Sequence, residues 1–233
     1  MTRTDRPLIL LSGGIDSTVA LAQSIANGYS AYTLAIDYGQ RHGRELSNAR
    51  AVADHYKVPH LVLEMSNWGS LVTSSLTNPD YPVPHGHYAS PEMQSTVVPN
   101  RNATLLMAAA GIAISAGCGR VVIAAHAGDA AIYLDCRPEF VDAANEVLRA
   151  ATDSAVRIDA PFLGMNKTDI VRLGAQLGAP FEFTWSCYEG ANLHCGQCGA
   201  CVERREAFTN AGVPDPTTYI GRMVTPCVQI ETA

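Results

Sequence analysis

The sequence lacks the features that mark two large classes of protein. It has no run of Lys and Arg, only 16% charged residues and a formal net charge of −6, whereas a protein that binds duplex nucleic acid usually shows a basic face. It also has no apolar stretch of about 18 residues, the length that suits a bilayer span. The longest such stretch, residues 103–116, is short and rich in alanine. We therefore expect no direct nucleic-acid binding and no membrane span.

The N-terminus also lacks the pattern of a secretory signal, because residues 1–6 are polar and lead directly into an apolar run. We expect a cytoplasmic location, where the seven cysteines would be thiols or metal ligands rather than disulfides. Charged residues are scarcer than the roughly 25% of an average soluble domain. This scarcity favours an oligomer in which a second subunit covers part of the surface.

What the sequence does contain is a regular alternation of strands and helices. Apolar runs predict strands at residues 7–11, 31–38, 60–65, 120–125 and 156–160. Helices are predicted between them, at residues 16–26, 44–56, 102–116, 139–151 and 167–177. Such alternation predicts an α/β fold, a Rossmann-like parallel sheet with helices on both faces.

Two segments differ from this pattern. Residues 66–99 carry five prolines between polar residues, and a loop of that length inside a domain is usually functional or disordered. From residue 183 onward the chain becomes rich in Cys and Gly, with one short helix predicted at residues 202–211. We therefore expect a main domain over residues 1–182 and a small zinc-binding appendage over residues 183–233.

A loop with two glycines follows the first predicted strand. Its residues are Leu11, Ser12, Gly13, Gly14, Ile15, Asp16, Ser17 and Thr18. The glycines allow a tight turn, and the helix start behind them offers unpaired N–H groups and hydroxyls to a phosphate. Because the Asp16 side chain is anionic, Mg²⁺ is expected between it and the phosphates. The alternative is a plain capping turn, with Ser12 or Asp16 as the cap.

The loop is not a Walker A motif, because the Gly-Lys-Ser/Thr ending is missing. Its pattern from Ser12 to Ser17 resembles the SGGxDS signature of the PP-loop ATP pyrophosphatases. The resemblance implies an adenine nucleotide alpha hydrolase-like fold that cleaves ATP between the α- and β-phosphates and transfers AMP to a substrate oxygen.

Four cysteines near the C-terminus have the spacing C-x7-C-x2-C-x2-C: Cys187, Cys195, Cys198 and Cys201. Four thiolates suit tetrahedral Zn²⁺ and leave no position open for water, so the metal is expected to be structural. Gly196 and Gly199 are expected to allow the tight turns of such a site. His194 is a rival fourth ligand. An iron–sulfur cluster or a set of buried free thiols would also be compatible with four cysteines.

Four further segments complete an ordered set of motifs: residues 38–42, 98–102, 135–140 and 184–188. With the phosphate loop and the cysteines they resemble the QueC family, the 7-cyano-7-deazaguanine synthases of the queuosine pathway, over nearly the whole chain from Ser12 to Tyr219. The resemblance implies that 7-carboxy-7-deazaguanine is adenylated by ATP, converted by ammonia to an amide, and adenylated again to give the nitrile. It also implies a homodimer.

Several of the candidate site residues are basic. Arg101 and Lys167 each stand at a predicted helix start, and we expect them to contact phosphate and to act with Asp16 and Ser17 in catalysis. Arg41 follows the second predicted strand and is expected to balance phosphate charge. The alternative for each basic residue is a solvated side chain or a simple helix cap.

The remaining candidates are expected to contact the second substrate: Tyr38, Gln40, His42, His126, Asp129, Asp135 and Arg137. For Cys136 a packing or substrate-wall role is favoured over a catalytic nucleophile. Residues 125–134 depart from the family pattern, since Leu134 stands where a proline is usual.

That departure supports a second hypothesis, a QueC-like ligase that joins the activated acid as an amide to another amine or to a protein N-terminus. Residues 66–99 would then help to receive the partner; otherwise they would be a lid or a dimer element. A nucleotide-binding regulatory protein without turnover is a third hypothesis. A tRNA-thiolating PP-loop enzyme is a fourth, although it would be expected to carry a basic surface.

Overall fold

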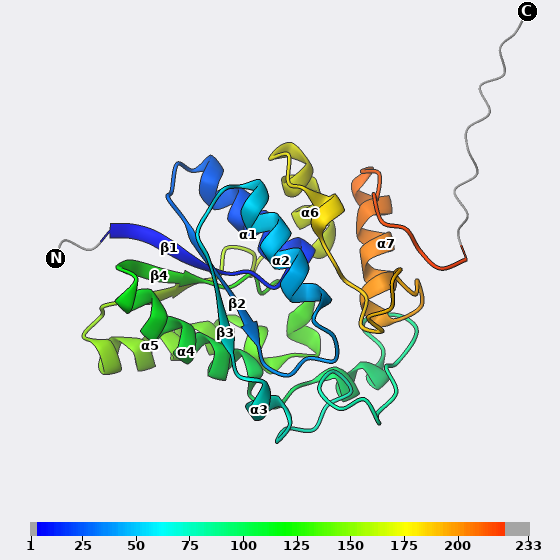
Figure 1. Ribbon diagram of the computed structural model, residues 1–233, viewed down its shortest axis with the longest axis horizontal. Helices are drawn as coiled ribbons and strands as arrows, with labels where there is room; N and C mark the ends of the chain where they lie inside the picture. The colour runs from blue at the N-terminus through cyan, green and yellow to red at the C-terminus, as the bar shows by residue number, and fades with distance from the viewer. Residues whose placement is uncertain (1–3, 222–233) are drawn as a thin grey trace, which may run out of the picture.

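A computed structural model describes residues 4–221 and contains a five-stranded sheet at its centre (Figure 1). The strands are β1 Thr4–Leu10, β2 Tyr32–Asp37, β3 His60–Glu64, β4 Cys118–Val122 and β5 Arg157–Asp159. Their order is β3-β2-β1-β4-β5 and every neighbouring pair is parallel. In the central strand, Leu8 is aligned with Tyr32 on one side and with Val121 on the other. The predicted parallel sheet is confirmed.

Helices cover both faces of the sheet, as predicted. The α-helices are α1 Ile15–Ala26, α2 Arg44–His55, α3 Ser66–Gly69, α4 Arg101–Ser115, α5 Pro138–Thr152, α6 Lys167–Gln176 and α7 Gly199–Ala211. Short 3-10 turns are η1 Pro91–Thr96, η2 Asp129–Ala131, η3 Leu134–Cys136 and η4 Phe181–Phe183. Helices α1, α2, α6 and α7 lie on one face, and α4 and α5 lie on the other (Figure 1).

The sheet separates two apolar clusters, because successive side chains of a strand point to opposite faces. Leu8 packs in the cluster under α4 and α5, and its neighbour Ile9 packs in the cluster under α1 and α6. Both are fully buried. Burial on both faces explains why the central strand reads as a continuous apolar run rather than as an alternating pattern.

One segment, Pro91–Ser115, is long and apolar enough to cross a membrane by length and composition alone, with 33% of the tested window buried. In the fold it is not one continuous helix. It consists of η1 and α4, and Asn100 between them has a left-handed backbone with φ of 57°. Leu106 and Ala110 of α4 are buried against the sheet. The predicted helix at residues 102–116 is therefore a core helix.

The strand order fixes where loops from distant parts of the chain meet. After β1 the chain crosses to α1 on one face, and after β4 it crosses to α5 on the other. Ligands of open α/β sheets bind at such a switch point, outside the carboxyl ends of the two strands. The loop over residues 11–14 and the segment over residues 123–137 therefore lie at one crevice.

Residues 66–99 form an ordered layer rather than a strand–helix unit. They contain α3 and η1, and they lie against the cysteine-rich segment, where the Gly86 amide donates to the Gln197 carbonyl over 2.9 Å. Farther along, Phe208 of α7 joins the same apolar cluster as Val19 and Ile170. The division of the chain at residue 182 stays a prediction.

Candidate active site and metal centre

The phosphate loop has the conformation that its glycines predict. Gly13 has φ of +80°, and a side chain there would collide with the carbonyl oxygen of Glu45. Gly14 is the N-cap of α1, and no side chain caps this helix. The capping alternative for Ser12 and Asp16 is therefore wrong, and the first amides of α1 are left for a ligand.

Hydroxyl groups of the loop form hydrogen bonds within it and so stabilise its conformation. The Ser12 amide donates to Ser17 Oγ over 3.2 Å, and the two hydroxyls lie 3.0 Å apart. The Thr18 hydroxyl is fully buried and donates to the Gly14 carbonyl over 2.8 Å. Thr18 therefore shapes the loop, whereas Ser12 and Ser17 line the cavity in front of it. The Leu11 side chain packs in the core.

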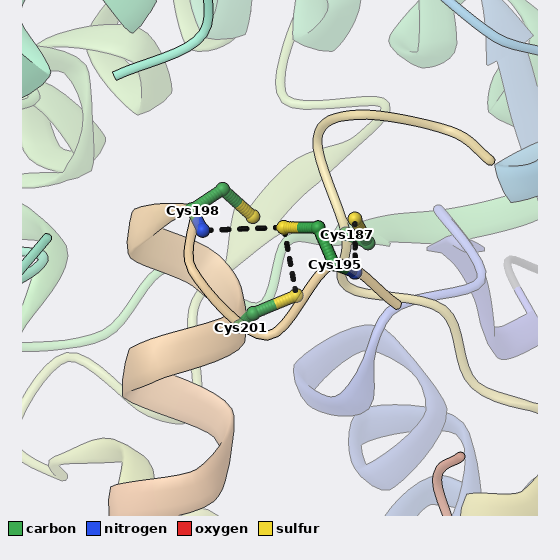
Figure 2. Close-up of side chains that lie close together, drawn as sticks. All are labelled: Cys187, Cys195, Cys198 and Cys201. Atoms are coloured by element: carbon green, nitrogen blue, oxygen red, sulfur yellow. Dashed lines mark hydrogen bonds between the residues drawn. The ribbon is translucent and has the colours of Figure 1, made fainter. Parts of the chain in front are cut away.

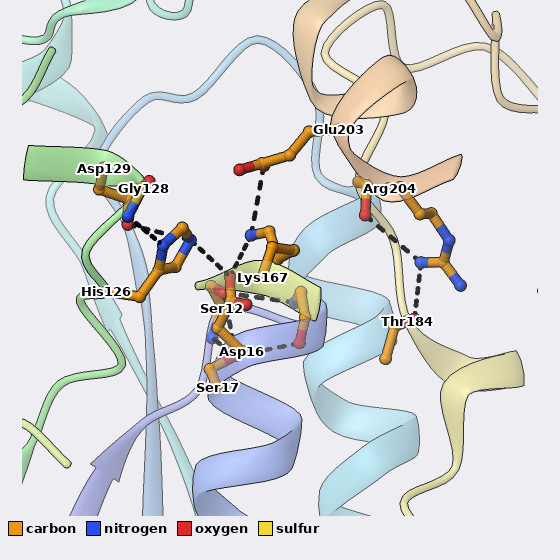
Figure 3. Close-up of polar contacts among 12 residues, drawn as sticks. Ser12, Asp16, Ser17, His126, Gly128, Asp129, Lys167, Thr184, Glu203 and Arg204 are labelled. Carbon is orange, nitrogen blue, oxygen red and sulfur yellow. Dashed lines mark hydrogen bonds and ion pairs between the residues drawn. The ribbon is translucent and has the colours of Figure 1, made fainter. Parts of the chain in front are cut away.

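A partly buried ion-pair network lies directly in front of the loop (Figure 3). Lys167 Nζ, at the start of α6, is 2.6 Å from Asp16 Oδ2 and 3.4 Å from Glu203 Oε2 of α7. Burial alone would raise the pKa of Asp16, but the nearby Lys167 outweighs it and the pKa is lowered. Burial would likewise lower the pKa of Lys167, but Asp16 and Glu203 raise it. Both groups are charged at neutral pH.

The second oxygen of Asp16 has no partner. Asp16 Oδ1 is buried and accepts no hydrogen bond from any described residue. A buried carboxylate oxygen without a partner is costly, because it has lost its water without replacement. A hard cation such as Mg²⁺ prefers this kind of oxygen ligand. The geometry therefore fits the expected magnesium ion at Asp16.

The segment after β4 supplies the other side of the network. His126 is fully buried, with Nε2 3.4 Å from Asp129 Oδ2 and 4.0 Å from Asp16 Oδ2. Burial, helped by Lys167, lowers the pKa of His126. Tyr88, from the loop over residues 66–99, donates its hydroxyl to Asp129 Oδ1 over 2.8 Å. Three separate parts of the chain thus meet at Asp16 and Asp129.

Arg101 enters from the opposite wall, at the start of α4. Its guanidinium lies 5.9 Å from the centre of the Tyr38 ring and 5.8 Å from that of Tyr133. Near it, burial raises the pKa of the Cys136 thiol to about 12, and Asn102 donates to its sulfur over 3.3 Å. The thiol is therefore protonated at neutral pH, which supports a wall role for Cys136 over a nucleophilic one.

These groups line one cavity of about 280 Å³. Five loop residues reach it, namely Ser12, Gly14, Ile15, Asp16 and Ser17. Four other expected residues line it too, namely Tyr38, Arg101, Asp129 and Lys167. A smaller, mostly apolar pocket of about 80 Å³ adjoins it and is lined in part by Leu11 and Gln40. The structure thus gathers the phosphate loop and these candidates at one place.

Other expected residues support the walls rather than line the main cavity. Arg41 donates to the carbonyls of Ser75, Pro79 and Tyr81, and so holds the loop over residues 66–99. His42 contacts the Tyr188 carbonyl. Their expected contacts with ligand stay predictions that this arrangement does not favour.

Two polar residues after η2 act in the same way. The Asp135 carboxylate accepts the Asn102 amide over 2.9 Å, close to the start of α4. Arg137 is exposed and donates Nε to the Ala130 carbonyl over 2.9 Å. In this arrangement both order the segment between β4 and α5.

Sequence reasoning missed four residues that line the cavity: Glu45, Tyr88, Glu203 and Arg204. Trp185 and Tyr188 line it too, and the sequence offered them only as part of the motif over residues 184–188, without a role. Burial raises the pKa of both Glu45 and Glu203 to about 7. Arg204 is fully buried, paired with Asp215 at 3.0 Å. The available signal was the presence of charged residues on an otherwise short helix directly behind the fourth cysteine.

The four predicted cysteines come together at the start of α7 (Figure 2). Their sulfur atoms all lie within 4.8 Å of one another, and those of Cys195 and Cys201 are 3.9 Å apart. Tetrahedral Zn–S bonds of about 2.3 Å imply sulfur separations of roughly 3.8 Å. Backbone amides of Gln197 and Cys198 donate to the Cys195 sulfur. The donor set and its spacing fit zinc.

Two details of the cysteine site need correction. His194 lies outside the cluster, because its Nε2 accepts the Ser186 amide over 3.1 Å and its ring packs on Trp185. Gly196 has the positive φ of a tight turn, 75°, but Gly199 has not. Gly199 is small for another reason: a side chain there would meet the sulfur of Met93 at 2.7 Å.

Together, the parallel sheet, the phosphate loop after β1 and the acid–lysine pair define an ATP-using enzyme of the PP-loop type. The family model described as queuosine biosynthesis protein QueC matches residues 6–212. The chain therefore belongs to the QueC family.

Individual relatives agree with this family. The 7-cyano-7-deazaguanine synthase of Brucella anthropi is 48% identical over 92% of this chain and 93% of its own length. That of Caldicellulosiruptor bescii is 43% identical over 92% of this chain and 97% of its own length. Among solved structures, the NMN synthetase of Francisella tularensis superposes with a TM-score of 0.54 at 15% identity, covering 90% of this chain and 78% of that one. That similarity supports the fold alone.

Proposed function

We propose that this protein is an ATP-dependent carbon–nitrogen ligase that converts 7-carboxy-7-deazaguanine and ammonia into 7-cyano-7-deazaguanine. The observation that carries the proposal is one cavity lined by two kinds of group. The uncapped start of α1 and the Asp16–Lys167 pair line it together with Arg101, which lies among aromatic rings. The relatives named above bear the name of this activity.

ATP is the nucleotide that the loop is built to receive. Its phosphates suit the free amides of α1 and the hydroxyls of Ser12 and Ser17. The adjoining apolar pocket, lined by Leu34 and Leu105 among others, suits the adenine ring. Residues Tyr38 and Glu45 line both spaces and lie at their junction.

Magnesium belongs to this proposal at Asp16. The free Oδ1 of Asp16 would hold the ion, and its charge would offset the repulsion between this carboxylate and the phosphates. Lys167 remains on Oδ2, where it adds a second positive charge near the phosphates. The zinc ion, in contrast, is structural, because four thiolates fill its coordination shell.

The chemistry follows from the need to activate a poor electrophile. A carboxylate oxygen of the substrate attacks the α-phosphorus of ATP, the bond to the pyrophosphate oxygen breaks, and pyrophosphate leaves. Ammonia then attacks the acyl carbon and AMP leaves, which gives the amide with loss of one proton. The amide oxygen takes a second AMP from another ATP, and loss of that AMP with two N–H protons leaves the nitrile.

In these steps the protein positions groups and neutralises charge rather than forming a covalent bond. Arg101 and Lys167 are cations that both line the cavity, where charge develops on phosphoryl oxygens. Both are preorganised by aromatic rings or carboxylates, so they need little reorganisation during the reaction.

The test is a mass-spectrometric assay with ATP, Mg²⁺, 7-carboxy-7-deazaguanine and ammonium. The expected result is the nitrile, with two AMP and two pyrophosphate released per product. Amide without nitrile would show that a different end product is made, which is the second hypothesis above. The relatives' names give that hypothesis no support. ATP binding without pyrophosphate release would contradict the enzyme proposal.

The homodimer and the cytoplasmic location remain part of the proposal. Both come from the family resemblance and the composition. The mass of the protein in solution, measured by light scattering behind gel filtration, decides the oligomeric state: twice 24.8 kDa supports the dimer, and 24.8 kDa contradicts it.

A further inference from the structure

A histidine stands directly behind the two carboxylates of the site without lining the cavity. His126 follows β4, is 0% exposed, and is absent from the cavity wall that Asp16 and Asp129 form. Its Nε2 is buried and makes no hydrogen bond of good geometry with any described residue. It lies between Asp129 Oδ2 at 3.4 Å and Asp16 Oδ2 at 4.0 Å (Figure 3).

The hydrogen-bond donor on this ring can be assigned from its other nitrogen. His126 Nδ1 lies 3.0 Å from the Gly128 amide, which can only donate, so Nδ1 is the acceptor. The ring proton is therefore on Nε2, the nitrogen that lies beside the carboxylates of Asp129 and Asp16. Gly128 has no side chain to displace the ring: a Cβ there would lie 2.9 Å from His126 Cε1. The tautomer and the position of the ring are thus both set by Gly128.

The two oxygens of the Asp16 carboxylate have different surroundings. Oδ2 lies 2.6 Å from Lys167 Nζ and 4.0 Å from His126 Nε2, which is an electrostatic contact rather than a hydrogen bond, whereas Oδ1 has no hydrogen-bond partner among the described residues. We propose that His126 is a positioning residue that turns the Asp16 carboxylate so that Oδ1 stays free for the magnesium ion of the nucleotide. The same nitrogen lies 3.4 Å from Asp129 Oδ2, and the other oxygen of Asp129 accepts the Tyr88 hydroxyl. This inference rests on the proposed function.

The expected size of the effect follows from the behaviour of groups that hydrogen-bond to metal ligands. Loss of such a partner typically costs roughly 10–100-fold in metal affinity. The contact here is long, so an effect near the lower end, about tenfold, is expected. Lys167 alone cannot fix the plane of the carboxylate, because one contact to Oδ2 leaves the group free to rotate about it.

The experiment compares two replacements, each of which imitates one of the two nitrogen positions of the His126 ring. His126→Asn keeps an acceptor near the Nδ1 position and loses the Nε2 donor, whereas His126→Gln keeps a donor near Nε2. The dissociation constant of Mg²⁺ is measured by calorimetry in the presence of saturating α,β-methylene-ATP, which the enzyme cannot cleave. We expect it to rise about tenfold in His126→Asn and to stay within about twofold of wild type in His126→Gln.

A matched control is His60, on the edge strand β3. It too has one nitrogen in contact, 2.9 Å from the Thr33 hydroxyl, and a buried Nε2 without a partner. His60→Asn is expected to leave Mg²⁺ binding unchanged. Gly128→Ala serves if His126→Asn does not fold, because it moves the ring and keeps every ionisable group. It is expected to weaken Mg²⁺ binding in the same direction.

The outcomes separate this inference from the proposed function. Unchanged Mg²⁺ binding in both His126→Asn and Gly128→Ala would overturn the positioning role, even if the wild type makes the nitrile. Equal weakening in His126→Asn and His126→Gln would overturn it as well, because the donor would then not matter. A wild type that binds Mg²⁺ and nucleotide but makes no product would contradict the proposed function and leave the positioning role intact.

Discussion

Asp16 carries the largest share of the proposed chemistry of any single residue. Its carboxylate joins the phosphate loop to Lys167 and offers the free oxygen for the cation. Asp16→Asn removes the charge but keeps the size of the side chain. Pyrophosphate release, followed by a coupled assay, is expected to fall by on the order of 10²–10³-fold, the usual cost of losing one preorganised electrostatic group.

The matched control is Asp142→Asn, an exposed carboxylate on α5. It should leave the rate unchanged. If Asp16→Asn retained more than a tenth of the wild-type rate while melting at the wild-type temperature, the proposed role of this carboxylate would be wrong.

Glu45 gives a second prediction at this scale, based on pH. Burial raises the pKa of Glu45 from the usual 4.5 to about 7, so the folded state holds the proton of this carboxyl more tightly than the unfolded state. The contribution of that proton to the free energy of unfolding is fully present below about pH 4.5 and is lost as the pH rises through 7. Glu45→Gln removes that loss. Relative to wild type, the variant is expected to gain on the order of 2 kcal/mol between pH 5 and pH 8, measured by urea unfolding. An equal difference at both pH values would contradict the shifted pKa.

At the scale of elements, the cysteine site and α7 form one unit that closes the cavity. Cys198 is the N-cap residue of α7 and Cys201 lies in its first turn, directly before Glu203 and Arg204. Cys195→Ser is expected to lose the zinc ion proposed at this site, measured by elemental analysis. Loss of a structural metal costs more than about 4 kcal/mol, which lowers the melting temperature by roughly 8–16 °C in a chain of this size.

Cys118→Ala is the control for the cysteine site, because Cys118 lies on β4 outside the cluster. It should keep one zinc per chain. Iron with the visible absorption of an iron–sulfur cluster, in place of zinc, would show that the metal assignment is wrong.

One hydroxyl of the loop over residues 66–99, that of Tyr88, donates to a carboxylate of the site. Tyr88→Phe removes the 2.8 Å hydrogen bond to Asp129, and a bond to a charged group contributes about 1.5–3 kcal/mol. Amide exchange of residues 82–97 is therefore expected to become at least about tenfold faster. Tyr81→Phe, an exposed residue of the same loop, is the control. Equal exchange in both variants would mean that the loop is held elsewhere.

What the sequence could predict about these elements depended on local signals. Strand and helix positions follow from apolar periodicity, and the phosphate loop follows from Ser12 and its glycines, so both agree with the structure. The start of α7 did not: it begins at Gly199, three residues before the predicted start. Its N-cap position is Cys198, which makes no side-chain capping hydrogen bond, so no ordinary N-cap residue marks this helix start in the sequence.

Contacts between residues that are far apart in the sequence could not be predicted from such local signals. Arg41 was expected to face phosphate, but the direction of a loop side chain depends on which carbonyls lie near it, here those of Ser75 and Tyr81. Glu203 meets Lys167 across 36 residues of sequence, and only the packing of α7 on α6 brings the two together. The site residues that sequence analysis missed are those that only the tertiary fold brings to the cavity.

For the whole molecule, the main question is whether residues 183–233 are separable. Phe208 and Ala207 of α7 are buried in the same cluster as Val19 of α1, and the Phe208 ring packs edge-on against Phe181 at 5.0 Å. We propose that the segment is integral to the folding unit. A chain of residues 1–182 would expose this apolar surface, and each aromatic ring of this kind buries roughly 150–250 Å².

The truncated chain is therefore expected to bind a hydrophobic dye and to melt without a cooperative transition, as followed by circular dichroism. A sharp transition near the melting temperature of the full chain would instead support two independent domains divided at residue 182.

The position of α7 also has a consequence for how the protein becomes active in the cell. The phosphate loop comes before Trp185, Glu203 and the cysteines in the order of synthesis. A nascent chain thus carries the loop that receives the nucleotide before it carries the wall that α7 supplies. If the cysteines hold zinc as proposed, turnover of ATP waits for that metal as well as for α7.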